Sequence, residues 1–479
     1  MGFVVVMVLA ASLRFATLGT QSVWTDEGNT LLWLHGSFGH MLSAVAHNES
    51  SPPLYFCIAW LWTRVFGDWI VALRALSAVF GCATVAVGFW GARRICGARV
   101  ATILGLLMAT SAMLIWYSQE ARQYALLLLL CTVSLVLWAR VLMCRQDRAI
   151  VWWAAVSGLA VATHYFAVFI VLPEAAILLL RAPRNRNAVV AAAILAAFFA
   201  VVTPFAIYQR NTTNISWIAQ SGSLISRVRG VEGTLLVEGG AGVPHAWWLG
   251  RLVVVAAFAL VLWRGTPRSR RIAGSALALA AGVVVLATVA ALVGFDYVLP
   301  RHLLPAYLPF AAALAVALGN ARAGVPGLLV AMVCAAVGLA VTFSINGDVA
   351  YQREDVRDAV HALDGPRPDR IVVLQRPDDY LLENGGWGAF QYYAPWLRSM
   401  SGAALSVTEV DVIDEGVRQA DIRATLVKLM RMGFRLRRTY AQQVFVTYRL
   451  VARRAIVVTR EALRRDGRFF GASPVLLIE

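Results

Sequence analysis

Two adjacent carboxylates follow the first apolar segment of this chain, within Trp24-Thr25-Asp26-Glu27. Only 11 of the 27 acidic residues lie in the first 350 residues, so each acid there needs a reason. A carboxylate at the edge of a membrane is a functional-site hypothesis, because it can accept a proton from a hydroxyl as a general base. Asp26 and Glu27 are therefore candidate catalytic residues. The alternative is that Asp26 caps a short helix.

A second polar group, Tyr117-Ser118-Gln119-Glu120-Ala121-Arg122-Gln123-Tyr124, joins two apolar segments. A tight connection needs few such side chains, so we expect Tyr117, Glu120 and Tyr124 to line a cavity. Arg122 can present a planar fork to an anionic oxygen. The alternative is a local Glu120–Arg122 pair that closes a turn.

A third group is Pro300-Arg301-His302-Leu303-Leu304-Pro305, where a cation and an imidazole enter an apolar segment between prolines. Broken helix at membrane depth is tolerated only against protein or a watery cavity. Arg301, with His302 beside it, is a candidate to hold a lipid-linked phosphate. The alternative for Arg301 is snorkelling to the interface.

Weaker candidates for the same cavity are Glu49 and Tyr55, in Glu49-Ser50-Ser51-Pro52-Pro53-Leu54-Tyr55, and His164. His164 could contact a sugar or a metal, but a lone histidine at a helix end is more often structural. Glu174 lies inside an apolar segment, where we expect it to be buried with a partner rather than catalytic.

The elements that must position these residues are membrane helices. The chain is 59% hydrophobic with a mean hydropathy of +0.67, whereas soluble domains are about 45–50% apolar. Apolar segments long enough to cross a membrane recur as far as about residue 345. They predict eleven spans, at 3–19, 69–92, 99–116, 123–144, 149–163, 165–181, 188–208, 246–264, 272–293, 303–321 and 325–345.

Arginine clusters in short connections set the expected orientation. The first 350 residues contain 23 Arg and no Lys, gathered at 93–99, 140–148, 181–186 and 264–271. Such clusters mark the inner side, so every candidate residue falls on the outside of the cell membrane. No compact basic patch with interleaved aromatics is present, so the net charge of +16 does not indicate nucleic-acid binding.

The rest of the chain completes the expected architecture. The segment 20–66 reads as an outer loop with interfacial helices near 41–46 and 54–66. We expect a transmembrane module at 1–348 and a small extracytoplasmic α/β domain at 349–479. In that domain, strands are predicted at 370–374 and 444–448, and helices at 355–363 and 420–432. The six cysteines read as small hydrophobes, and the first segment as a retained helix rather than a signal peptide.

Taken in order, these motifs resemble the GT-C superfamily of polyprenyl-phosphate-sugar-dependent glycosyltransferases. The similarity is to the family 39-like bacterial group related to protein O-mannosyltransferases and the lipid A aminoarabinose transferase. It covers about residues 10–310 and extends to Leu13-Arg14-Phe15, Ser51-Pro52-Pro53-Leu54-Tyr55-Phe56 and Leu73-Arg74-Ala75-Leu76-Ser77.

The resemblance implies an inverting transfer at the outer face of the cell envelope. Asp26 would deprotonate the acceptor hydroxyl, and Arg301 with Arg122 would hold the departing polyprenyl phosphate. Some relatives use a divalent metal, for which Glu27, Glu120 and His164 are the potential ligands.

This chain departs from the better-known members in its loops, because the first loop has no lysine near Ser51-Pro52-Pro53. The sugar (mannose, arabinose, glucose or galactose) and the acceptor (glycan, lipid or protein) therefore stay open. The competing interpretations are a transporter or flippase of polyprenyl-linked sugars, and a non-catalytic glycan-binding protein.

Overall fold

The computed structural model describes residues 1–181, 184–212, 217–237, 240–375, 388–399, 404–415, 419–442, 444–459 and 475–478. By its internal contacts the chain divides into two compact units. The first contains Met1–Leu18 and Gly36–Gly347, and the second contains Gly19–His35 and Asp348–Glu479. The division into a transmembrane module at 1–348 and a C-terminal domain at 349–479 stays a prediction.

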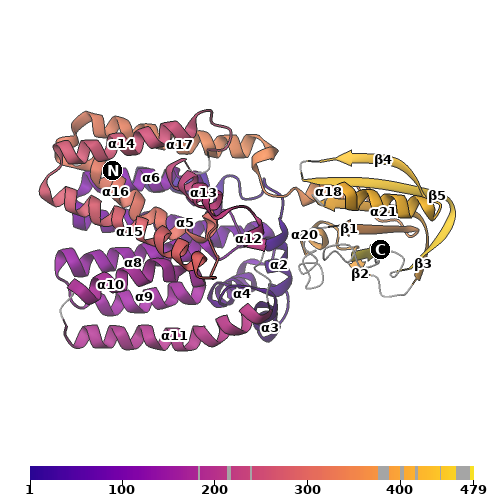
Figure 1. The fold of residues 1–479 in the computed structure, drawn as a ribbon, viewed down its shortest axis with the longest axis horizontal. Helices are drawn as coiled ribbons and strands as arrows, with labels where there is room; N and C mark the ends of the chain where they lie inside the picture. Colours follow the sequence, from indigo (N-terminus) through magenta and orange to yellow (C-terminus); the bar gives the residue numbers. More distant parts are fainter. Residues whose placement is uncertain are drawn as a thin grey trace. The chain divides into compact units, whose positions relative to one another are not determined.

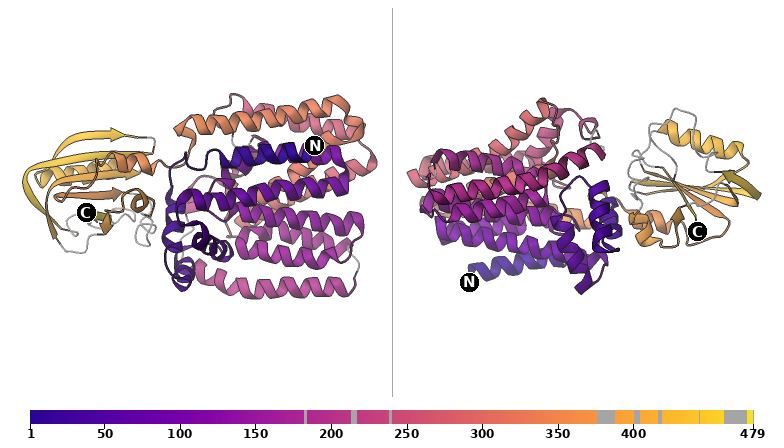
Figure 2. Two further views of the ribbon diagram at one scale, coloured as in Figure 1. Left: turned by 180° about the vertical axis from the view of Figure 1, so that it is seen from behind. Right: turned by 90° about the horizontal axis from the view of Figure 1, so that it is seen from below.

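The first unit is a helical bundle whose long helices run side by side (Figures 1 and 2). Many of its buried apolar side chains, from α1 to α17, form one cluster. The helices are α1 (Gly2–Phe15), α3 (Phe38–Asn48), α4 (Leu54–Phe66), α5 (Ile70–Cys96), α6 (Ala98–Thr110), α7 (Ala112–Ser118), α8 (Tyr124–Cys144), α9 (Ala149–Thr163), α10 (Val168–Arg181), α11 (Arg186–Thr212), α12 (Trp217–Gln220), α13 (Leu224–Val237), α14 (Ala246–Arg264), α15 (Pro267–Leu292), α16 (Tyr307–Gly319) and α17 (Gly324–Gly347).

Ten of the eleven expected spans each lie mainly on one α-helix, and the span at 99–116 lies on two, but the helix lengths differ. Among the described residues, six helices are long and apolar enough to cross a membrane, and seven if a bent pair counts as one. The helices α1, α9, α10 and α16 have 13 to 15 residues. At 1.5 Å per residue they reach only about 20–23 Å, less than a hydrocarbon core of roughly 30 Å. The chain is thus a multi-pass membrane protein with six to seven candidate spans by length.

The expected span at 99–116 is a bent pair rather than one helix. α6 and α7 meet at 59°. Ser111 between them has extended backbone, and its hydroxyl accepts a hydrogen bond from the Leu114 N–H, which starts α7. The buried guanidinium of Arg14 donates to the carbonyls of Met108 and Ala109, the last turn of α6. A serine cap and a buried cation therefore satisfy the backbone groups that the bend exposes.

The connections between helices gather at two opposite ends of the bundle. At one end the arginine-rich connections contact each other: Arg268 donates to the Ile95 carbonyl at 3.2 Å, and Arg99 donates to that of Gly324. The other end carries α3 and α4, the interfacial helices expected in the first loop. It also carries α12 and α13, which lie where the sequence suggested only a loop at 209–245.

The second unit is built on a six-stranded mixed sheet with the order β2-β6-β1-β3-β5-β4. β1 and β3 are parallel and the other neighbours are antiparallel. Helix α21 (Gln419–Arg431) covers one face (Figure 2). The strands are β1 (Arg370–Gln375), β2 (Arg398–Ser399), β3 (Ala404–Glu415), β4 (Arg435–Ala441), β5 (Phe445–Thr459) and β6 (Val475–Ile478). The other α-helices within the described residues are α2 (Thr25–Leu34), α18 (Val356–His361) and α20 (Gly388–Tyr393).

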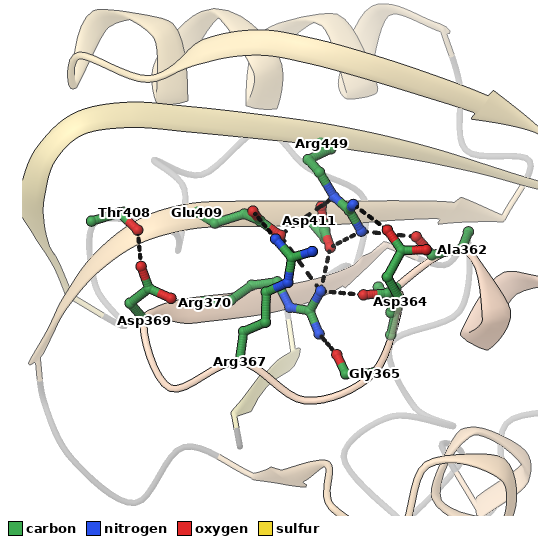
Figure 3. A network of polar contacts seen from close by, with 11 residues as sticks. Ala362, Asp364, Gly365, Arg367, Asp369, Arg370, Thr408, Glu409, Asp411 and Arg449 are labelled. Atoms are coloured by element: carbon green, nitrogen blue, oxygen red, sulfur yellow. Dashed lines mark hydrogen bonds and ion pairs between the residues drawn. The ribbon is translucent and has the colours of Figure 1, made fainter.

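The face of the sheet opposite α21 buries a network of charges (Figure 3). Alternation along the strands places Ile371 and Val410 against α21, and Arg370, Asp411 and Arg449 on the other face. Arg449 Nε lies 2.9 Å from Asp411 Oδ1, and Arg370 lies 3.3 Å from Asp411 Oδ2.

The same two arginines also bind the chain that precedes β1. Arg370 donates to the carbonyls of Leu363 and Gly365, and Arg449 pairs with Asp364 at 2.6 Å. Burial raises the pKa of Asp411, and the hydrogen bond from Arg449 lowers the pKa of Asp364. The network therefore fastens the segment 362–367 to the sheet.

Candidate functional site

Aromatic and imidazole rings cluster at the end of the bundle that carries α3 and α4. The rings of Tyr117 and Tyr124 are 5.0 Å apart, and Tyr124 lies 5.6 Å from His164. His164 lies 6.2 Å from His302, which lies 4.0 Å from Phe166. These residues come from α7, α8, the α9–α10 connection and the turn before α16. The structure therefore brings together four residues that the sequence marked separately: Tyr117, Tyr124, His164 and His302.

Both histidines of this cluster are buried and neutral. Burial first, and then the charges of Arg122 and Arg301, lower the pKa of His164 to about 3. Burial, and then Arg301, likewise hold the pKa of His302 well below its ordinary value. Both guanidinium groups thus act on His164, and Arg301 also acts on His302. We call Arg122, His164, Arg301 and His302 the arginine–histidine cluster.

The hydrogen bonds of the two imidazoles fix their tautomers. His164 Nδ1 accepts from the backbone N–H of Phe166, so its proton is on Nε2. His302 Nδ1 lies 2.9 Å from the carbonyl of Tyr297, which can only accept, so its proton is on Nδ1. A neutral imidazole has one donor and one acceptor. His164 therefore keeps an Nε2–H donor and His302 an Nε2 acceptor.

Arg122 forms a buried ion pair with Glu49. Its Nη2 lies 2.6 Å from Glu49 Oε2, and both side chains are less than one-tenth exposed. Arg122 also lies 5.7 Å from the centre of the Phe56 ring. A buried pair of this kind is costly to break, because removing one partner leaves a desolvated charge. This pair ties the first loop to the 119–123 connection.

Two glutamines hold the same part of the first loop in place. Gln123 donates to the Ser51 hydroxyl at 3.1 Å. Gln209, at the end of α11, donates to the carbonyls of Val45 and Ser51, and accepts from the Tyr165 hydroxyl at 2.7 Å. Sequence reasoning did not single out Gln209. The signal that the sequence offered was an amide side chain at the end of an apolar segment.

The 119–123 connection is itself fixed to α1. Gln119 donates to the carbonyls of Leu13 and Arg14 and to the Thr17 hydroxyl. Arg14 in turn donates to the end of α6, so the two side chains tie α1 to both flanks of the bend. Neither residue was expected to act in this way, because their partners are backbone carbonyls about a hundred positions away in sequence.

The two adjacent carboxylates, Asp26 and Glu27, belong to the second unit and begin helix α2. The cap position is Trp24, so Asp26 lies in the first turn rather than at the cap. Glu27 is fully buried, whereas Asp26 is half-buried. Carboxylates in the first turn are stabilised by the helix dipole.

The remaining expected cavity residues lie in the first unit. Tyr55, at the start of α4, is fully buried and packs edge-on against Phe56 at 5.5 Å. Glu120 is buried in the 119–123 connection, and its carbonyl accepts from the Arg122 N–H at 2.8 Å.

A metal site is not formed by the described parts of the chain. They contain no group of three His, Cys, Asp or Glu side chains that could hold an ion. Glu120 and His164 belong to the first unit, and Glu27 to the second.

The fold and the cluster define a class. It is a multi-pass membrane protein with one buried arginine, one half-buried arginine and two buried imidazoles at one end of its bundle, a setting suited to an anionic ligand. Residues 50–208 match the family described as dolichyl-phosphate-mannose-protein mannosyltransferase. A protein of Aquifex aeolicus (strain VF5) without an assigned function is 30% identical over 198 residues, which are 38% of this chain and 38% of that protein. The chain thus aligns with well under two thirds of that relative's length.

Two solved structures share the fold over most of its length. ArnT from Cupriavidus metallidurans bound to undecaprenyl phosphate has a TM-score of 0.56 at 13% identity, and its apo state has 0.57 at 12%. Each alignment covers 93% of this chain and 97% of the ArnT chain. The family resemblance expected from the motifs is confirmed over residues 50–208, and the expected fold over most of the chain.

Proposed function

We propose that this protein is an inverting glycosyltransferase that moves a sugar from a polyprenyl-phosphate donor to an acceptor hydroxyl. The arginine–histidine cluster is the observation that carries this proposal. A phosphate that leaves a sugar gains negative charge, and preorganised donors aimed at developing charge are a large catalytic contribution. Arg301 and the Nε2–H of His164 are donors of the required kind.

In the proposed reaction, Asp26 takes the proton of the acceptor hydroxyl. The hydroxyl oxygen then bonds to the anomeric carbon as the bond from that carbon to the phosphate oxygen breaks. The electron pair of that bond leaves with the polyprenyl phosphate, whose charge Arg301 balances. Arg122 forms an ion pair with Glu49 at 2.6 Å. We therefore propose that Arg122 holds the first loop in place as well as contributing positive charge to the site.

We further propose that all eleven expected spans cross the cell membrane, with the arginine–histidine cluster and the C-terminal residues outside. Four short helices would cross where broken or 3-10 turns extend them, as before α10 and α16. The gathering of the arginine-rich connections at the opposite end supports this orientation.

A transporter would need polar groups in the middle of its spans. Glu174 is a buried acid in the middle of an expected span. It accepts hydrogen bonds from Ser134 at 2.6 Å and from Trp153 at 2.8 Å. These bonds hold α8, α9 and α10 together. They favour a structural role for Glu174, as expected from the sequence, over a substrate path.

Asp26→Asn tests the proposal. The amide keeps the size and hydrogen bonding of the carboxylate but cannot take the proton, so turnover should fall roughly 10²–10⁴-fold. The assay measures release of undecaprenyl phosphate from undecaprenyl-phosphate-linked mannose, arabinose, glucose or galactose, with a cell-envelope fraction as acceptor. Glu27→Gln is the matched control. Near-normal turnover of Asp26→Asn would remove Asp26 as the base.

A further inference from the structure

Helix α2, which carries Asp26 and Glu27, crosses helix α20 at two glycines. A Cβ atom on Gly388 would lie 2.5 Å from the carbonyl oxygen of Gly28 and 2.7 Å from its carbonyl carbon. A Cβ atom on Gly28 would in turn overlap the backbone nitrogen of Ala389. Real Cβ contacts are essentially never shorter than 3.0 Å. Only glycine at both positions therefore allows the two backbones to lie this close.

Hydrogen bonds from the C-terminal residues hold the start of α2 as well. The Thr25 hydroxyl donates to Glu354 Oε2 at 2.8 Å. The backbone N–H of Val23 donates to the Tyr393 hydroxyl at 2.7 Å. These two contacts lie on either side of the cap residue Trp24. Thr25 is one residue before Asp26, and Val23 is three residues before it.

The chain that leads into α2 is bound in the same way. The backbone N–H of Arg357 donates to the Ser22 hydroxyl at 3.1 Å, and its guanidinium donates to the Gln21 carbonyl at 3.2 Å. Arg353 donates to the side chain of Gln21 at 3.2 Å. The segment 21–25 is thus bound to residues more than three hundred positions away in sequence.

The charge network of the sheet holds the segment that follows α18 in place. Arg370 and Arg449 hold the carbonyls of 362–365 (Figure 3). That segment directly follows α18, and α18 follows Arg353 and Glu354. The network therefore holds in place the segment that contains Arg353, Glu354 and α18, from which several of the contacts to the α2 region are made.

We propose that the C-terminal domain is a positioning device, in which Gly388, Glu354 and Tyr393 hold α2 so that Asp26 is aimed at the acceptor hydroxyl. This inference rests on the proposed function, because it gives a role to residues that orient the base. A general base must lie within about 2.6–3.2 Å of the proton that it abstracts. A displacement of about 1 Å can cost on the order of 10²-fold in rate.

Gly388→Ala in the full-length protein is the first test. Its added methyl group must move α2 and α20 apart, so turnover should fall by about 10–100-fold. Binding of bare undecaprenyl phosphate should stay within about twofold, because Arg301 belongs to the first unit. Hydrogen exchange at residues 24–34 should accelerate. Gly274→Ala is the matched control, since a Cβ there meets nothing within 4 Å.

Thr25→Val and Thr25→Ser form the second test. Valine has the shape of threonine but cannot donate to Glu354, whereas serine keeps the hydroxyl. Turnover should fall in Thr25→Val and recover in Thr25→Ser, while the melting temperature stays close to that of the parent. A purely structural role would lower the melting temperature of Thr25→Val without this selective loss of turnover.

The outcomes separate the two proposals. If Asp26→Asn is inactive while Gly388→Ala and Thr25→Val turn over normally, the base stands and the positioning role is overturned. Faster exchange in Gly388→Ala, with turnover lost and donor binding kept, supports positioning. If Asp26→Asn is active, the proposed base fails; exchange at 24–34 that is unchanged in Gly388→Ala overturns the positioning role whatever Asp26 does.

Discussion

Arg122 and Arg301 lie in different surroundings within the cluster. Arg122 is buried against the carboxylate of Glu49 at 2.6 Å, and that contact neutralises it locally. Arg301 lies next to His302 at the start of a broken helix, and its charge lowers the pKa of both imidazoles. Since the imidazoles stay neutral, a bound phosphate would be balanced chiefly by the guanidinium groups. Arg301 is the residue to which the proposed function gives the phosphate, so it is the first residue to test for anion binding.

Arg301→Ala should weaken binding of bare undecaprenyl phosphate by about 10–100-fold, because one or two charge-assisted hydrogen bonds contribute about 1.5–3 kcal/mol. Arg301→Lys should recover only part, since an ammonium cannot match two phosphate oxygens with a planar fork. Equilibrium binding of the lipid in detergent or nanodiscs measures both. The exposed Arg322 at the opposite end supplies the control, Arg322→Ala. Unchanged binding in Arg301→Ala would mean that Arg301 only snorkels.

The buried, neutral His164 makes stability depend on pH. Its pKa is about 3 in the folded protein and near 6.5 in the unfolded chain. Well above pH 6.5 the imidazole is neutral in both the folded and the unfolded protein, so the free energy of unfolding does not depend on its protonation there. As the pH falls from 6.5 toward 3, the unfolded state takes up the proton and the folded state does not, so the free energy of unfolding decreases. The melting temperature of His164→Gln should therefore vary less between pH 6.5 and 4 than that of the parent.

The matched control for this titration is His40→Gln, because His40 is exposed. It should keep the pH dependence of the parent protein. A parent and a His164→Gln variant with parallel curves would show that His164 is not held neutral by the fold.

For single residues, the sequence predicted which side chains gather at the candidate site better than it predicted the groups that they bind. Tyr117, Tyr124, His164 and His302 were expected because polar groups at the ends of apolar segments are unusual, and they do meet. Arg14, Gln119 and Gln209 were missed because they bind backbone carbonyls. Which carbonyl a side chain reaches depends on how helices pack, and no local pattern records that.

At the scale of elements, the Glu49–Arg122 pair joins the first loop to the α7–α8 connection. Glu49→Gln and Arg122→Gln should each destabilise the protein by about 3–5 kcal/mol, because each leaves a buried charge without its counterion. The double variant should lose much less than the sum of the two, since no charge is left behind. Thermal or denaturant unfolding in detergent measures the coupling.

The exposed pair Arg251–Glu232 offers a control for this cycle. Its atoms are 3.0 Å apart, but both side chains are about two-fifths exposed. Exposed pairs contribute about 0–1 kcal/mol, so the same cycle should give a small coupling. Additive losses at Glu49 and Arg122 would show that their contact does not hold the loop.

Helix positions were predictable and helix geometry was not. An apolar segment marks where a helix lies, so each expected span lies mainly on one α-helix or, at 99–116, on two. The 59° bend at Ser111 depends on a serine cap and on Arg14 from another helix. Two strands and two helices of the C-terminal domain were found from their patterns. The order of the sheet depends on pairings across the domain, which short apolar patterns do not specify.

At the scale of the whole molecule, the main surprise concerns the segment 19–35. Sequence order places it in the first loop of the membrane module, whereas its contacts place it in a compact unit with the C-terminal residues. Glycines at 28 and 388 made this association possible, and neither is recognisable in advance as one half of a pair. The candidate base thus depends on a domain whose role the motifs did not indicate.

The orientation of the molecule can be tested by labelling cysteines in intact cells. Arg437→Cys, exposed on β4, should react with an impermeant thiol reagent, whereas Arg184→Cys and Arg271→Cys, exposed at the arginine-rich end, should not. The natural Cys144, also free and exposed at that end, is an internal control that should stay unlabelled. Permeabilised cells should label all four. The reverse pattern, with Cys144 labelled and Arg437→Cys silent, would mean that the arginine-rich connections face outward and that the proposed site faces the cytoplasm.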